Sequence, residues 1–75
     1  MTELTPDQEH FFDVAWRSLR LAAALTKNNR RARAQEVLRE AQFAIFKMPR
    51  GFTDEDFRQQ YEQLYNQLYR GIPNA

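Results

Sequence analysis

The sequence predicts an all-α protein, a small antiparallel three-helix bundle formed by 75 residues. Apolar residues recur at helical spacing in three segments, and the two glycines and three prolines fall near segment ends. With 43% hydrophobic residues the chain is too apolar to be disordered. We place the helices at about 6–26, 30–47 and 54–70 of a single domain, 1–75. Because so short a chain without cysteine has a small core, the alternative is a helical hairpin that dimerisation completes.

The first helix is predicted from its N-terminal signals. Thr5 can cap the free amides, Pro6 suits the first helical position, and Gln8 completes a capping box. The apolar residues that follow cover more than half of the circumference: Phe11, Phe12, Val14, Ala15, Trp16, Leu19, Leu21, Ala22, Ala23 and Leu25. So broad an apolar face predicts contacts with more than one neighbour.

The second helix begins after the polar break at 27–29. Asparagine tolerates left-handed geometry at a helix end, and Asn28 or Asn29 can also cap the next helix. Pro49 and Gly51 end this helix. The arginines in its first turn oppose the helix dipole, at a cost of roughly 0.3–1 kcal/mol.

The third helix has the strongest start signal in the chain. We expect Thr53 to cap it, with Asp56 at the capping-box position. Phe52 and Phe57 occupy the two positions of a hydrophobic staple around that cap. Gly71 is the expected left-handed stop.

The second helix has apolar residues on two sides. One stripe belongs to a single predicted core: Phe12, Trp16, Leu19, Leu38, Ala41, Ile45, Phe57, Tyr61, Leu64 and Leu68. Phe43 and Phe46 project from roughly the opposite side. A core needs one stripe, so a second aromatic patch indicates a partner. We therefore predict a partner-binding surface with Phe43 and Phe46 as anchors and Arg39 and Lys47 as its charged rim.

Catalytic groups are scarce in the sequence. There is no cysteine, and the only histidine, His10, stands eight residues from the only serine, Ser18, hence about 12 Å along one helix. Asp7, His10 and Asp13 are read as a solvated first turn rather than as metal ligands, and the acids at 54–56 as a helix start. We expect no enzyme, no catalytic residue, no metal and no cofactor.

A basic segment supports an alternative function, nucleic-acid binding by an accessory protein. The net charge is only +1, yet no acid occurs between Val14 and Gln35. The cations that would contact phosphates are Arg17, Arg20, Lys27, Arg30, Arg31 and Arg33. Tyr61, Tyr65 and Tyr69 could stack on bases, but their spacing favours the edge of the core.

The leading hypothesis is a small non-enzymatic protein–protein interaction module, acting as a regulator, inhibitor or adaptor. It would dock its aromatic helical surface onto another protein or onto itself as a homo-oligomer. No apolar run approaches the roughly 20 residues that span a bilayer, so we expect no membrane insertion. The N-terminus lacks the pattern of a signal peptide, and we expect a cytoplasmic location.

Overall fold

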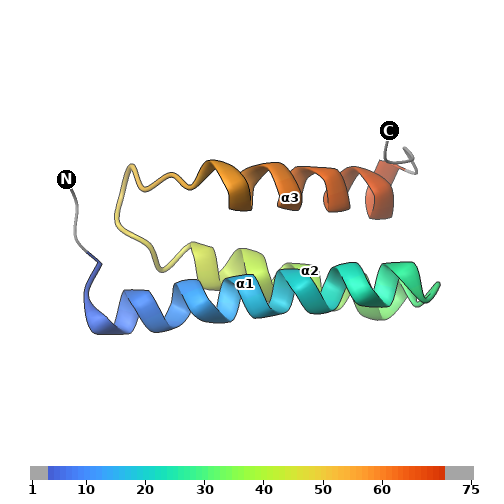
Figure 1. Cartoon of the computed structure of the whole chain (residues 1–75), viewed down its shortest axis with the longest axis horizontal. Helices are drawn as coiled ribbons and strands as arrows, with labels where there is room; N and C mark the ends of the chain where they lie inside the picture. Colours follow the sequence, from blue (N-terminus) through green and yellow to red (C-terminus); the bar gives the residue numbers. More distant parts are fainter. Residues whose placement is uncertain (1–3, 71–75) are drawn as a thin grey trace.

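A computed structural model describes residues 4–70 as an all-α, antiparallel three-helix bundle, which confirms the predicted fold class. Helix α1 (Pro6–Lys27) and helix α2 (Arg31–Ile45) form a hairpin. Helix α3 (Glu55–Tyr65) lies along this hairpin and runs parallel to α1 (Figure 1). A π-helix, η1 (Asn66–Arg70), continues α3.

Helix α1 starts as the sequence predicts. The Gln8 backbone N–H donates to the Thr5 hydroxyl at 3.2 Å, and the Thr5 N–H donates to the Gln8 side-chain carbonyl at 2.9 Å. This reciprocal pair is a capping box, and Pro6 occupies the first helical position.

The turn between α1 and α2 is a Schellman motif. The Arg30 N–H donates to the Leu25 carbonyl at 2.8 Å, and the Asn29 N–H donates to the Thr26 carbonyl at 3.1 Å. Asn29 has the left-handed φ of 62° that such a turn requires, as predicted for this asparagine pair. The prediction that Asn28 or Asn29 caps α2 is wrong: the capping position belongs to Arg30, whose side chain forms no capping bond. Asn28 and Asn29 form the C-terminal turn of α1, and α2 begins at Arg31, so its N-cap position is Arg30.

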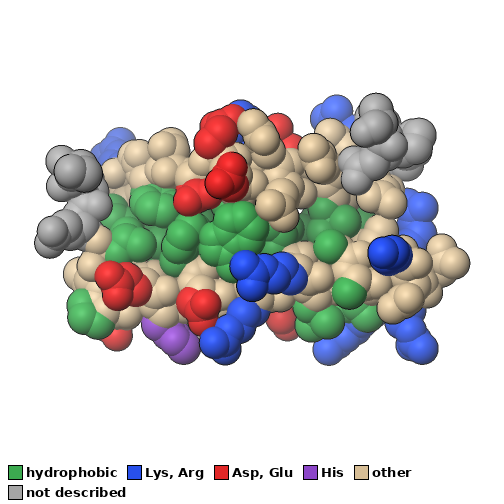
Figure 2. Space-filling model, viewed as in Figure 1, with side chains coloured by type: hydrophobic (Ala, Val, Ile, Leu, Met, Phe, Trp, Pro, Cys, Tyr) green, Lys and Arg blue, Asp and Glu red, His purple; other side chains and the backbone are tan. Residues whose placement is uncertain are grey.

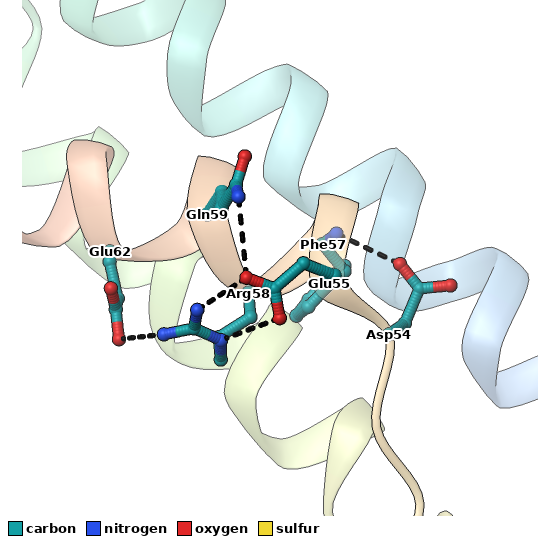
Figure 3. A network of polar contacts seen from close by, with 6 residues as sticks. All are labelled: Asp54, Glu55, Phe57, Arg58, Gln59 and Glu62. Atoms are coloured by element: carbon teal, nitrogen blue, oxygen red, sulfur yellow. Dashed lines mark hydrogen bonds and ion pairs between the residues drawn. The ribbon is translucent and has the colours of Figure 1, made fainter.

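The start of α3 corrects a second cap. Its N-cap is Asp54, which accepts a hydrogen bond from the Phe57 N–H at 2.9 Å (Figure 3); Thr53 was expected there. The one-residue shift also removes the staple, because Phe52 and Phe57 no longer occupy the positions just before the cap and four residues after it. Both rings instead lie against Phe12 of α1, with centroids 5.3 and 6.2 Å away. A long-range aromatic contact thus replaces the expected local one.

The two candidate caps of α3 can be separated by matched substitutions. We expect Asp54→Ala to lower the free energy of unfolding by about 1 kcal/mol, because the Phe57 N–H then loses its acceptor. Thr53→Ala removes no capping bond and serves as the control. Urea denaturation followed by circular dichroism measures both, and a larger loss in Thr53→Ala would show that the threonine is the cap.

The core lies between the three helices. Small residues from α1 and α2, such as Ala15 and Ala41, allow these helices to approach closely, and α3 closes the core from one side. The buried apolar side chains are Ala15, Leu19, Ala22, Ala34, Val37, Leu38, Ala41, Ala44, Phe57, Leu64 and Leu68. Six of the ten predicted core residues are among them. The other four, Phe12, Trp16, Ile45 and Tyr61, are only half-buried at its edges, because their large side chains extend past the narrow helix–helix contacts.

The C-terminal end of α3 departs from the expected regular helix. The Arg31 guanidinium donates to the Gln67 and Leu68 carbonyls at 3.2 and 3.1 Å, and the Gln35 amide donates to the Leu68 carbonyl at 2.9 Å. These donors from α2 satisfy carbonyls at the helix end, where intrahelical partners run out. The interval from 66 to 70, expected as α-helix, is therefore a π-helix held by side chains of another helix. Gly71, the predicted stop, lies outside the described residues.

Candidate functional site

The outer face of α2, which we define as Arg39, Glu40, Phe43, Phe46 and Lys47, carries two exposed aromatic rings. Phe43 is 61% exposed and Phe46 is 68% exposed. Neither ring belongs to the buried cluster that joins the three helices. The structure therefore leaves both rings exposed, as their helical spacing predicts: Phe43 within α2, opposite its buried stripe, and Phe46 at the C-cap of α2.

The two predicted rim residues differ in their surroundings. Arg39 is exposed, and no acid within residues 4–70 forms an ion pair with it. Lys47 lies just beyond the C-cap of α2, where its Nζ atom is 5.9 Å from the centroid of the Phe11 ring. At this distance the ammonium group interacts with the negative face of the aromatic ring. Lys47 thus belongs to the outer face of α2 and also contacts the adjacent flank of α1.

A groove adjoins Phe46, between the C-terminal end of α2 and the N-terminal half of α3. Its volume is about 300 Å³, and most of its lining is apolar. The lining residues are Gln42, Ile45, Phe46, Phe52, Thr53, Asp54, Phe57, Arg58 and Tyr61. Sequence reasoning missed this groove because it had assigned Ile45, Phe57 and Tyr61 wholly to the core. Its formation depends on the separation of α2 and α3, for which no local sequence pattern is diagnostic.

The polar edge of the groove is an ion-pair network on α3. Arg58 bridges Glu55 and Glu62, and Gln59 donates a further hydrogen bond to Glu55 (Figure 3). Hydrogen bonds from Arg58, and then from Gln59, hold the pKa of Glu55 below its ordinary value, and the two acids raise the pKa of Arg58. Because two carboxylates surround this guanidinium, it adds little net positive charge to the groove.

Tyrosines extend the aromatic surface along α3 and η1. Tyr61 and Tyr65 stack with ring centroids 6.1 Å apart, and Tyr65 and Tyr69 stack at 4.7 Å. Tyr65 and Tyr69 are 40% and 43% exposed, as expected for tyrosines at the core edge. Burial, and then the nearby Tyr65 and Tyr69 hydroxyls, raise the pKa of Tyr61. The Tyr61 hydroxyl therefore stays neutral at physiological pH.

A different aromatic cluster covers the seam between α1 and α3. Trp16 lies edge-on to Phe57 at 5.3 Å, and the Arg20 guanidinium lies 5.7 Å from the Trp16 ring centroid. Figure 2 shows a band of hydrophobic side chains between these two helices. Unlike Phe43 and Phe46, these rings contact one another and the core, so their exposed edges have a structural explanation.

The basic segment does not form one unengaged patch. Arg17 pairs with Asp13 at 2.9 Å, and Arg33 pairs with Glu36 at 3.0 Å. Arg31 holds the carbonyls of η1, as described above, and Arg20 lies over Trp16. Lys27 and Arg30 are exposed, and neither forms an ion pair within residues 4–70. Arg31 thus has a structural role that sequence reasoning missed, since no local pattern predicts a bond to a helix end 36 residues away.

Within residues 4–70, no three His, Cys, Asp or Glu side chains are grouped so that they could hold a metal ion. No helix in this range is long and apolar enough to cross a bilayer. Comparisons with protein-family models, curated proteins and solved structures gave no match.

Proposed function

We propose that this protein is a small non-enzymatic interaction module, a regulator, inhibitor or adaptor, that docks through the outer face of α2. The observation that carries the proposal is the exposure of Phe43 and Phe46, 61% and 68%, on a bundle whose core is complete without them. Moving an exposed aromatic ring out of water into an interface is favourable by the hydrophobic effect. Interfaces are accordingly enriched in aromatic residues.

The surroundings of Phe46 fit an interface anchor. Its ring is at the edge of the apolar groove between α2 and α3, which has room for a partner's side chain. Burying the two phenylalanines would contribute roughly 1.5–3 kcal/mol each before the entropic costs of association. Arg39 and Lys47 would then form the hydrated rim and favour partners with acidic side chains beside the apolar contact.

The proposal predicts which surface positions contact a partner in the cell. A photo-crosslinking residue placed at position 43 or 46 should give discrete protein adducts, because these positions would be buried at the interface. The control carries the same residue at position 21, since Leu21 is an apolar residue of α1 that is 50% exposed. Mass spectrometry of purified adducts would identify what is bound.

A second measurement tests whether the two rings are required. The double variant Phe43→Ser/Phe46→Ser should lose specific capture by more than tenfold, while its thermal unfolding changes little because neither ring is in the core. Equal adduct formation at position 21, or undiminished capture by the double variant, would contradict the proposal. A double variant that unfolds would show that the rings stabilise the bundle itself.

A further inference from the structure

The charged side chains of the outer face of α2 follow a pattern that matches itself in reverse. Glu40 and Lys47 are seven residues apart, so at about 100° per residue they lie on nearly the same flank, about 10 Å apart along the helix. Lys47 follows the C-cap Phe46, whose backbone is still in the α region, and its N–H donates to the Ala44 carbonyl at 3.1 Å in a 3₁₀-type turn that continues the winding of α2. Phe43 lies between them. Glu40 is exposed and has no ion-pair partner within residues 4–70.

A second copy of the chain can use this pattern twice. When two identical helices face each other about a twofold axis that makes them antiparallel, each flank meets the same flank of the other copy. With the axis close to Phe43, Glu40 of each copy comes opposite Lys47 of the other. Two equivalent ion pairs then border a centre where the Phe43 rings meet.

The opposite flank is complementary in the same arrangement. It carries Arg39 and Phe46, and the axis near Phe43 brings Arg39 of one copy to within about one helical turn of Phe46 of the other. A guanidinium packs favourably against an exposed aromatic ring. A parallel pair would instead place Glu40 of each copy beside Arg39 of the other, which also gives two ion pairs but no Glu40–Lys47 contact, so charge reversal at Glu40 and Lys47 distinguishes the two arrangements.

We propose that the outer face of α2 binds a second copy of this chain, forming an antiparallel α2–α2 homodimer. This inference rests on the proposed docking function and names its partner. One helix face from each copy buries less than a standard interface. We therefore expect a weak dimer that forms only at high protein concentration.

Analytical ultracentrifugation over a wide concentration range tests for the dimer. The wild-type mass should rise from 9.0 kDa towards twice that value. Phe43→Ser/Phe46→Ser should remain monomeric, and the control Leu21→Ser should dimerise like wild type. A wild-type chain that is monomeric at every concentration overturns the dimer. It leaves the proposed function standing if position 43 still crosslinks to a different protein in the cell.

Charge reversal tests the antiparallel pairing. Glu40→Lys and Lys47→Glu alone each replace two attractive pairs by two repulsive ones, and each should weaken self-association by roughly tenfold or more. Mixing these two variants should restore a heterodimer, because every lysine then meets a glutamate. The double variant Glu40→Lys/Lys47→Glu should dimerise within about threefold of wild type. The control Glu9→Lys makes the same charge reversal on α1 and should leave self-association unchanged.

The outcome that overturns the antiparallel arrangement is specific. If wild type dimerises but neither the mixture nor the double variant recovers, Glu40 and Lys47 do not face each other. If Phe43→Ser/Phe46→Ser dimerises like wild type, another surface forms the dimer. Circular dichroism of each variant confirms that the monomer remains folded, so that loss of the dimer is not loss of the bundle.

Discussion

Replacing Leu38 by alanine is expected to lower the free energy of unfolding by about 2–5 kcal/mol. This side chain is 1% exposed and is among the largest fully buried ones within residues 4–70. Its removal costs the transfer free energy of the lost methyl groups and leaves a cavity in a core otherwise rich in alanine. Small alanine side chains cannot move in to fill that space.

The loss is a large share of the stability that a domain of this size has, about 5–15 kcal/mol for typical proteins. Urea denaturation of wild type and Leu38→Ala, followed by circular dichroism, gives the difference. Leu21→Ala is the matched control, since the same atoms are removed at a position that is 50% exposed. Similar losses at both positions would mean that Leu38 is not at the centre of the core.

Replacing Phe57 by alanine should be at least as damaging, by about 3–5 kcal/mol. Phe57 is 5% exposed and joins α3 to α1. Its ring centroid lies 5.3 Å from that of Trp16, 6.2 Å from that of Phe12 and 6.2 Å from that of Tyr61. No other buried side chain of α3 has such an aromatic setting, so α3 loses its main attachment near its N-terminus.

The effect of Phe57→Ala can be followed at the neighbouring indole. Trp16 fluorescence should shift to the red as its edge becomes hydrated, and the urea midpoint should fall. Phe43→Ala removes the same atoms from a ring that is 61% exposed, and it should leave both signals close to wild type. A Phe57→Ala variant as stable as Phe43→Ala would contradict the attachment of α3 through this cluster.

Local signals in the chain were sufficient for much of the fold. The capping box of Thr5 and Gln8 involves residues three apart, so neighbouring chemistry decides it. The left-handed Asn29 is likewise a property of a short segment. The exposure of Phe43 and Phe46 also followed from sequence, because helical periodicity alone separates them from the apolar stripe of α2.

Longer-range features required the assembled bundle. The N-cap of α3 is Asp54 and not the predicted Thr53. Phe52 and Phe57, on either side of this cap, both pack against Phe12 of α1. The π-helix η1 occurs where Arg31 and Gln35 bond its carbonyls from another helix. The groove beside Phe46 lies between two helices, and neither helix predicts their separation.

The sequence by itself determined the helical class, the first cap, the reversal between α1 and α2, and which rings of α2 face away from the core. Each of these depends on residues within a few turns of one another, where spacing and backbone preference decide. Only the tertiary structure decided where α3 begins, the role of Arg31 and the groove next to Phe46. These depend on contacts between residues distant in the chain, whose geometry is set by how large and small side chains pack together.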